Sequence, residues 1–359
     1  MFSKSTRRIG LACGAAVLVG LGVGVPVASG ATGDAISVPS GFTTTTFASG
    51  GTLSHPDDLT VLGGNVYVAY QNGVGSAGEP SPTGQTASTV VEYTPKGQQV
   101  AQWKLTGKVD GMTANATAGN LVATVNEDGN SSLYTITPAA PAAQQVKHYT
   151  YSPNPLPHGG GTDSIAVANG ALYISASNPS PNADGKTFTK PALYKVTLSG
   201  TTATAISVFQ DNSTATDAAT GKPTTLNLSD PDSNTVMPAA APRFAGDLLL
   251  DSQGDGQLVF LAHPGSSNQA ATVLKLNTQV DDTAVATASA GTLYVTDTAA
   301  NKVIAVHGSF TAGDVFTAVP SDSKALAGTL GQLDLKTGTV SPFGKGFTNP
   351  HGLLFVPNS

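Results

Sequence analysis

Apolar residues in this chain come in runs of three to five, separated by turn residues. After residue 31 no stretch shows sustained helical periodicity. One phrase keeps returning: a polar residue, a strand of small and β-branched residues, a glycine turn and a second strand. It occurs at 57–68, at 163–174 and at 281–295. Each copy predicts a pair of antiparallel strands, so the pattern predicts an all-β chain built from repeats.

Aligned on its first residue, the phrase has six copies, which begin at Asp57, Asp110, Asp163, Asp232, Asp281 and His351. Successive copies begin 49 to 70 residues apart, and a repeat of roughly 40–50 residues is typical of a four-stranded propeller blade. We therefore predict a β-propeller, most simply one with six blades of four antiparallel strands. Five or seven blades remain open, because residues 309–346 hold more strand-like stretches than one blade needs.

Turn residues place the strands of the first two blades. We expect these strands at 59–61, 66–70, 89–93 and 100–105, and then at 112–114, 120–125, 132–137 and 145–150. The last copy ends one strand after His351, so we expect the alternating segment 42–47 to close the ring. A blade that mixes strands from both ends of the chain leaves no open sheet edge. Residues 32–359 are expected to form this single domain.

Residues 1–31 have the features of a secretory signal peptide, with a basic start, an uncharged run over 9–27 and small residues up to Ala31. The glycines in the run argue against a membrane anchor, which is the alternative for an apolar run of this length. The pair Arg7-Arg8 leaves Sec and twin-arginine export both open. Cleavage after Ala31 would also remove Cys13, the only cysteine, so we predict a secreted protein without disulfides or thiolate metal sites.

Composition limits the partners of the secreted protein. Only 11% of the residues are charged and the formal net charge is −6, so no basic surface for nucleic acid is expected. Once the signal is removed we expect no membrane association. Insertions at 73–88, 178–190 and 211–229 are predicted on the face where the phrases begin. We expect this loop-rich face to bind a small molecule, a glycan or another protein.

The residues that begin the six phrases precede the innermost strands, so we expect them to meet near the mouth of the central channel. These candidate site residues are Asp57, Asp110, Asp163, Asp232, Asp281 and His351. In one interpretation, the aspartates are Asx-turn formers that accept backbone N–H groups of their own blades. In the other, the mutually repelling carboxylates hold a divalent cation such as calcium through oxygen ligands.

Histidines and one acidic turn add further candidates. His158 and His351 lie beside glycines in segments that lead into innermost strands, which makes them the candidate catalytic histidines. Segment 251–256 contains part of a calcium-loop pattern but lacks the closing glutamate, so it predicts a tight hairpin between 247–250 and 257–261. The sequence contains neither Gly-x-Ser-x-Gly nor His-Glu-x-x-His, the signatures of common hydrolases.

Segment 293–304 resembles an NHL-type repeat, and Asn349-Pro350-His351-Gly352-Leu353 resembles the start of an inner strand in the SMP-30/gluconolactonase-like six-bladed propellers. The resemblance covers about two blades and implies the fold. In the lactonase-like enzymes, a channel metal is held by a Glu, an Asn and an Asp. Asp110-Gly111 is similar to one of these positions, whereas Asp57 stands where the glutamate would be. The family also has a lyase branch that uses a histidine, to which His351 would correspond.

Two functions follow as hypotheses. The first is an extracellular binding or scaffold protein that uses its loop-rich face, which the missing hydrolase signatures favour. The alternative is a metal-dependent hydrolase or lyase whose site is at the mouth of the central channel.

Overall fold

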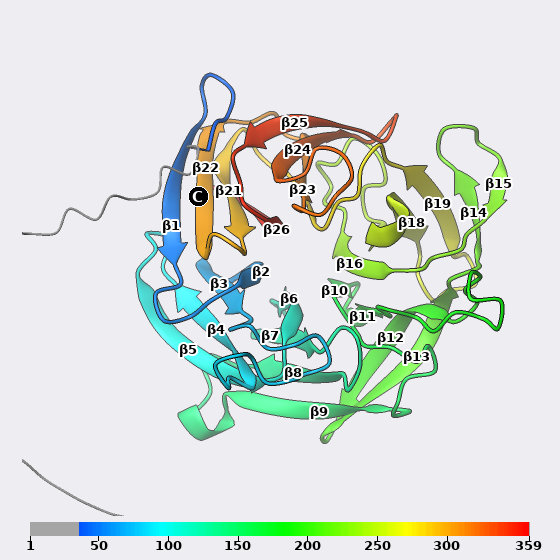
Figure 1. Cartoon of the computed structure of the whole chain (residues 1–359), viewed down its shortest axis with the longest axis horizontal. Helices are drawn as coiled ribbons and strands as arrows, with labels where there is room; N and C mark the ends of the chain where they lie inside the picture. The colour runs from blue at the N-terminus through cyan, green and yellow to red at the C-terminus, as the bar shows by residue number, and fades with distance from the viewer. Residues whose placement is uncertain (1–35, 359) are drawn as a thin grey trace, which may run out of the picture. The chain divides into compact units, whose positions relative to one another are not determined.

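The computed structural model describes residues 36–358, and within them the chain consists of strands. The strands number 26 in five sheets, and the only helices in this part of the chain are two single turns, η1 (Ala142–Gln144) and η2 (Gln253–Asp255). The sheets surround a central axis (Figure 1). The all-β propeller predicted from the sequence is confirmed.

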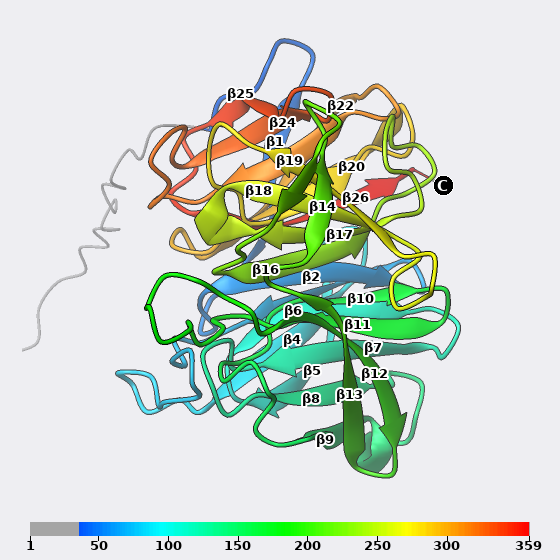
Figure 2. The ribbon, with the colours of Figure 1, turned by 90° about the vertical axis from the view of Figure 1, so that its right-hand side faces the viewer.

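The first three blades follow the chain in order, each from its innermost to its outermost strand. Blade 1 comprises β2 (Pro56–Leu62), β3 (Asn65–Tyr70), β4 (Ala87–Tyr93) and β5 (Gln99–Thr106). Blade 2 comprises β6 (Val109–Asn115), β7 (Asn120–Val125), β8 (Ser132–Ile136) and β9 (Val146–Ser152). Blade 3 comprises β10 (Ile165–Ala168), β11 (Ala171–Ser175), β12 (Pro191–Ser199) and β13 (Thr202–Gln210). Figure 2 shows β13 beside β9, where a parallel pairing joins blades 2 and 3.

Blade 4 carries the longest insertion as extra strands. Its four main strands are β16 (Pro231–Val236), β17 (Leu248–Ser252), β18 (Gln257–Ala262) and β19 (Ala270–Lys275). Within the 211–229 insertion, β14 (Thr214–Asp217) pairs in parallel with β19, and β15 (Pro223–Thr225) pairs with β14. The insertion therefore widens blade 4 at its outer edge. The tight hairpin expected at 251–256 is confirmed by η2 between β17 and β18.

Blades 5 and 6 are interleaved in sequence. Blade 5 comprises β20 (Thr283–Val285), β23 (Val315–Val319), β24 (Thr329–Asp334) and β25 (Thr339–Lys345). The strands β21 (Ala290–Asp297) and β22 (Lys302–Ser309) lie between β20 and β23 in the chain but belong to blade 6. The prediction that 283–285 pairs with 293–295 is therefore wrong, since β20 pairs with β23. The surplus of strands in 309–346 is explained as well, because β23, β24 and β25 return to complete blade 5.

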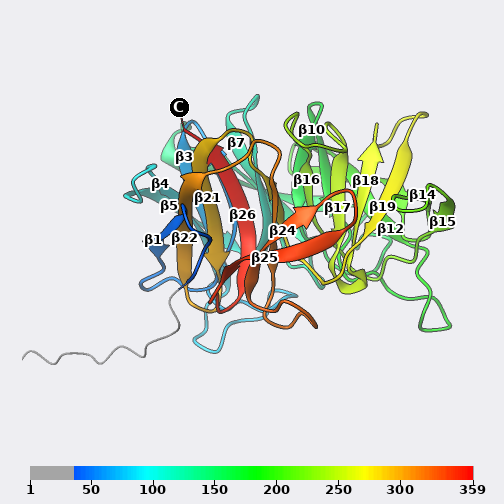
Figure 3. The ribbon, with the colours of Figure 1, turned by 90° about the horizontal axis from the view of Figure 1, so that it is seen from above.

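Blade 6 closes the ring with both ends of the described chain. Its innermost strand is β26 (Pro350–Pro357), which pairs with β21, and its outermost strand is β1 (Thr43–Ser49), which pairs with β22. Figure 3 shows β21 and β22 between these two terminal strands. The closing strand predicted at 42–47 is confirmed, and the pairing gives six four-stranded blades, the simplest count that the sequence allowed.

The core consists of apolar layers between neighbouring blades. Between blades 5 and 6, for example, Phe316, Val295 and Leu353 are almost fully buried in one cluster. Because both faces of each blade are covered, the middle strands are nearly continuous apolar runs, as in β7 and β18. Burial of each large side chain contributes roughly 1.5–3 kcal/mol, so these layers hold the inner strands in place around the axis.

The predicted signal peptide at 1–31, with Cys13, lies outside the described residues and stays a prediction. Within residues 36–358, no helix is long and apolar enough to cross a lipid bilayer.

Candidate ligand site in the central channel

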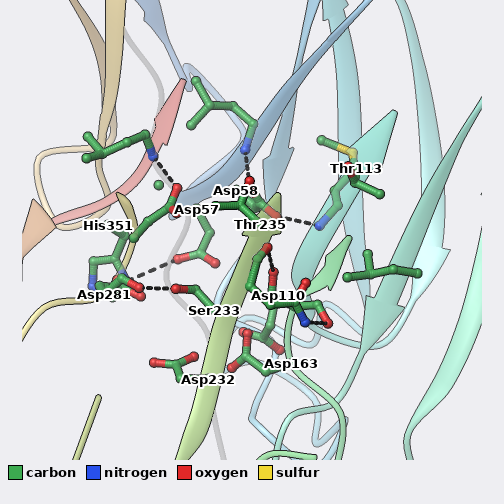
Figure 4. Close-up of a pocket in the computed structure, with 18 of the residues that line it drawn as sticks. Asp57, Asp58, Asp110, Thr113, Asp163, Asp232, Ser233, Thr235, Asp281 and His351 are labelled. Atoms are coloured by element: carbon green, nitrogen blue, oxygen red, sulfur yellow. Dashed lines mark hydrogen bonds and ion pairs between the residues drawn. The ribbon is translucent and has the colours of Figure 1, made fainter. Parts of the chain in front are cut away.

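The innermost strands of all six blades line one cavity of about 310 Å³. The structure brings together in its wall every residue that begins a phrase, namely Asp57, Asp110, Asp163, Asp232, Asp281 and His351 (Figure 4). Local backbone geometry contributes to this convergence. The inner strands of blades 1, 2 and 4 each have a register shift at the start of the phrase, and a bulge of this kind redirects the side chains beside it.

The aspartates at the first phrase position are not Asx-turn formers. Within the described residues, none of the five accepts a hydrogen bond from a backbone N–H group. The aspartates at the second phrase position accept backbone N–H groups instead. Asp58 accepts the N–H groups of Leu59, at 2.6 Å, and of Met112 in the next blade. Asp282 likewise accepts those of Thr283, at 2.6 Å, and of Leu353 in the next blade, at 2.7 Å. The Asx interpretation of the ring is therefore wrong, because a different residue does the backbone bracing.

The second phrase position connects each blade to the next all the way around the ring. Its six residues are Asp58, Gly111, Ser164, Ser233, Asp282 and Gly352. Where it is serine, the hydroxyl donates to a backbone carbonyl of the following blade, as Ser164 does to Asn234 O at 3.3 Å. Where it is glycine, the backbone of the following blade approaches so closely that a side chain would collide with it. This belt holds the inner strands in register and so fixes the positions of the cavity carboxylates.

The first of three charged groups around the cavity centres on Lys108. Its Nζ lies 2.8 Å from Asp110 Oδ1 and also contacts Glu127, and Gln71 Nε2 donates to Asp110 Oδ1 at 3.0 Å. The other carboxylate oxygen of Asp110, Oδ2, is buried and has no hydrogen-bond partner among the described atoms. Burial raises the pKa of Asp110 well above its usual range, although Lys108 opposes the shift. When both carboxyls are ionised, the two carboxylates and one ammonium give the group one net negative charge.

The second charged group is a pair of neighbouring carboxyls, Asp163 and Asp232. Burial raises the pKa of both groups well above the usual range. A hydrogen bond between the two side chains lowers the pKa of Asp163 and raises that of Asp232. Two like charges in one buried site disfavour double ionisation, so the pair holds a proton more readily than two separate carboxyls would. With one proton between them, the pair carries one negative charge.

The third charged group surrounds His351. Its Nδ1 lies 2.6 Å from Asp281 Oδ2 and 3.3 Å from Asp57 Oδ1, and its Nε2 lies 2.7 Å from Asn349 Nδ2. Burial alone would lower the pKa of His351, but the two carboxylates more than offset this and raise it well above the usual value. Protonation of Nε2 would require the Asn349 amide to turn its oxygen toward the ring. With two carboxylates and one imidazole, this group retains at least one negative charge.

The other candidate histidine, His158, does not reach the cavity. It is fully buried, with Nδ1 2.9 Å from the Tyr194 hydroxyl and Nε2 2.6 Å from Gly161 O. Nε2–H therefore donates to the carbonyl and Nδ1 accepts from the hydroxyl, which is the neutral form. Burial lowers the pKa of His158 to about 4. The flanking glycines serve close backbone packing, since a side chain at 160 or 161 would overlap neighbouring carbonyls.

A pH dependence of stability follows from His158. Its folded pKa of about 4 lies below the usual value of roughly 6.5. The contribution is therefore fully present above pH ~6.5 and is lost as pH falls toward 4, because the unfolded chain takes up the proton first. We expect a loss of about 3 kcal/mol over this interval. Urea unfolding at several pH values, compared between the wild type and His158→Asn, isolates this term; equal pH slopes in both proteins would contradict it.

Several residues of the site were missed in the sequence. Lys108, Glu127 and Gln71 line the cavity, yet each lies just before or after a strand, where a polar residue is unremarkable. Lys108 did carry a signal, since it stands two residues before the phrase aspartate of its own blade. Glu127 belongs to the β7–β8 turn, lines the cavity and pairs there with Lys108.

The cavity offers oxygen ligands, but its carboxylates are spread around the wall. Within residues 36–358, no group of three or more His, Cys, Asp or Glu side chains is arranged to hold one metal ion. The lactonase-like resemblance implies a set that includes an asparagine, which this finding does not address. A divalent cation at the ring stays a prediction.

Comparison with solved structures agrees with the fold. A protein of unknown function from Bacteroides thetaiotaomicron is 9% identical, with a TM-score of 0.50 over 87% of this chain and 70% of that chain. A periplasmic gluconolactonase from Pseudomonas aeruginosa is 13% identical, with a TM-score of 0.41 over 84% of this chain and 88% of that chain. A structural-genomics protein assigned as a gluconolactonase is 11% identical, with a TM-score of 0.45 over 87% and 83%.

No protein-family model matches the chain, and no curated protein sequence matches it. At such low identities the structural matches concern the fold alone. The resemblance to gluconolactonase-like β-propellers that the sequence indicated is confirmed as a likeness of fold by the order of strands around the axis, with which the match at a TM-score of 0.50 agrees.

Proposed function

We propose that this protein is a binding protein whose channel cavity takes up a small organic cation carrying two or three amino groups. The observation that carries the proposal is the arrangement of three carboxylate-rich groups around one cavity. They are centred on Lys108, on the Asp163–Asp232 pair and on His351. With the carboxyls of the first and third groups ionised and one proton on the Asp163–Asp232 pair, each group carries at least one negative charge. Bound ammonium groups would offset these charges and part of the cost of burying them.

The spread of the charges favours an extended cation over a single ion. No three acidic or histidine side chains of the described chain converge closely enough to hold one metal ion, whereas ammonium groups joined by methylenes can reach separate carboxylates. The apolar part of the wall suits such methylenes, and its lining residues include Leu59, Met112, Ile165, Leu353 and Leu354. A volume of about 310 Å³ lies at the lower end of ligand pockets, so the ligand is small.

Spermidine titrated into the purified protein by calorimetry at low salt tests the proposal. We expect one saturable site per chain that weakens as salt is added. The double variant Asp163→Asn/Asp232→Asn removes the charge of this pair and should weaken binding about tenfold, in line with the ~1.5–3 kcal/mol of a charge-assisted hydrogen bond. Asp334→Asn is the matched control, because Asp334 is exposed in the β24–β25 turn outside the cavity, and it should bind like the wild type.

Two results would overturn this proposal. One is a wild-type protein that binds no spermidine, and the other is an Asp163→Asn/Asp232→Asn variant with unchanged affinity. Calcium binding that is lost in Asp163→Asn, without any amine binding, would instead support the metal ring predicted from the sequence.

A hydrolase or lyase acting at the channel mouth is the second candidate, and the pairing of His351 with Asp281 at 2.6 Å favours it. A histidine held by a carboxylate at a cavity wall is suitably placed to act as a general base. The first substrates to test are sugar lactones, because two of the proteins similar in fold are named gluconolactonases. Hydrolysis by the wild type that disappears in His351→Gln, with spermidine binding retained, would support this second function.

We also propose that the protein acts after export, as the composition of residues 1–31 indicates. N-terminal sequencing of protein recovered from outside the producing cells tests this, and we expect it to begin near residue 32. An intact N-terminus in all cell fractions would contradict it.

A further inference from the structure

Asp251 is a buried carboxyl that the proposed ligand site does not use. It lies on β17 of blade 4, is only 1% exposed, and is not part of the cavity wall. Neither of its carboxylate oxygens has a hydrogen-bond partner among the atoms of residues 36–358. A buried polar group without a partner is costly, so the position of Asp251 needs an explanation.

The other blades show what this position normally does. Strand register places Asp251 in blade 4 where blades 2, 3 and 6 have Thr124, Ser175 and Thr296. Each of these three hydroxyls accepts the backbone N–H of the second phrase residue in its own blade, at 3.2, 2.9 and 2.7 Å respectively. Only in blade 4 is the hydroxyl replaced by a carboxyl, and there the equivalent hydrogen bond is not made. The substitution therefore does not serve the bracing role of the position.

Asp251 faces the junction with blade 5. Side chains two residues apart on a strand share a face, and Leu249, on the same face, packs in a cluster with Val280 and Val285 of blade 5. From the other side, Thr283 shares a face with Val285 and so points back toward blade 4. Thr283 is 5% exposed, and its hydroxyl also has no partner in the described chain. Three buried oxygens without partners thus lie at one junction between two blades.

The electrostatic surroundings of this junction are negative. The carboxylates of Asp281, Asp230 and Asp282 lie close enough to act electrostatically on Asp251. These acids come from the ends of the neighbouring strands. A negative potential in a buried, oxygen-rich junction favours a hard cation, which prefers oxygen ligands of this kind.

We propose that Asp251 and Thr283 form an interior site for a small hard metal cation, with calcium as the ion. Both carboxylate oxygens and the hydroxyl are ligands of a type that calcium takes. A single carboxylate gives few charges, so the site is one of modest affinity that stabilises the junction of blades 4 and 5. Thr283 also lines the cavity of the proposed function, whereas Asp251 does not, so the site adjoins that cavity without depending on what the cavity binds.

Thermal unfolding of the wild type and two variants tests the site. The protein is unfolded in choline chloride, and then at the same ionic strength with CaCl₂ or NaCl. We expect calcium to raise the wild-type midpoint by about 2–4 °C, because an ion that binds only the folded state stabilises it. Asp251→Thr installs the hydroxyl of blades 2 and 6, so it should unfold at a higher midpoint than the wild type in choline chloride and show no calcium response.

A second variant, a spermidine titration and a sodium control test the site further. Asp251→Asn should lose the calcium response without the gain in choline chloride, because its amide still lacks a partner. Spermidine affinity should be unchanged in Asp251→Thr, which separates this site from the cavity. A shift with sodium alone that Asp251→Thr removes would support the site with sodium as its ion. A calcium shift that persists in full in Asp251→Thr, or a wild type that responds to neither ion, would overturn the proposal.

Discussion

A chain that ends at Asn349 is expected to have no cooperative unfolding transition. The truncation removes β26, the innermost strand of blade 6, which pairs along its length with β21. Leu353 and Phe355 on one face of β26 are buried between blades 5 and 6, while Leu354 and Val356 on the other face pack against the layer shared with blade 1. Losing several large buried side chains at roughly 2–5 kcal/mol each exceeds the ~5–15 kcal/mol stability of a typical domain.

Circular dichroism during heating measures this loss. A peptide that spans 348–358, added to the truncated chain, is expected to restore a transition, whereas the same peptide with Leu353 replaced by Asp should not. A truncated chain that unfolds sharply at the midpoint of the full-length protein would show that the ring does not depend on β26.

The interleaving of blades 5 and 6 makes this dependence stronger than in a ring of independent blades. The chain lays down β20 of blade 5, then two strands of blade 6, and then returns to finish blade 5. Blade 5 is complete only after the chain has passed through two strands of blade 6, and blade 6 is complete only when β26 has paired with β21 and β1 with β22. Contacts between residues far apart in the chain must therefore form together, which is the arrangement expected to fold slowly.

The same interleaving marks the limit of the sequence prediction for the fold. Segments 283–285 and 293–295 have the strand–turn–strand pattern of the other phrases, and the pattern correctly predicts two strands. It cannot say that the second strand pairs with β26, because the choice of partner depends on which distant strands are available in the finished ring. Local alternation specifies a strand and its faces, but not its neighbour.

For the candidate site, too, the sequence predicts some of the residues but not their partners. The repeat predicted that six polar residues would meet at the axis, since every innermost strand faces the channel in any propeller. The sequence did not predict the partners of these residues. Lys108 contacts Asp110 and Glu127 contacts Lys108, from a loop and a turn whose positions depend on packing. His158 was singled out because glycines surround it, yet those glycines allow close packing of backbone, and its two ring nitrogens are both satisfied internally.

One signal in the sequence could have revealed the belt. The second phrase position carries only Asp, Gly or Ser in all six copies, whereas the third carries large apolar residues in four of them. A position restricted to short or absent side chains around a whole ring indicates close approach between neighbours. The structure shows that approach, with Asp58 and Asp282 reaching into the next blade and glycine following each of them in the ring.

Replacing Gly111 or Gly352 by alanine is expected to destabilise the protein by about 3 kcal/mol or more, at the upper end of overpacking effects. A Cβ at Gly111 would lie 2.5 Å from Asp163 O, and one at Gly352 would lie 2.9 Å from Leu59 Cδ2 and overlap Asp57 O. The colliding atoms are mostly backbone of the next blade's inner strand, which cannot rotate away as a side chain could. Relief would require two blades to separate at the belt.

Gly129→Ala is the matched control for these variants. Gly129 lies in the β7–β8 turn, and an added Cβ would meet only Ala77 Cβ at 3.9 Å, an ordinary contact. We expect this variant to stay within about 0.5 kcal/mol of the wild type, as surface substitutions usually do. Urea unfolding of the three variants measures the differences. Because Gly352 lines the cavity and Gly111 does not, equal losses in both would assign the effect to the belt between blades. A Gly111→Ala variant as stable as the control would mean that the inner strands can move apart, and then the belt could not be what holds the cavity carboxylates in place.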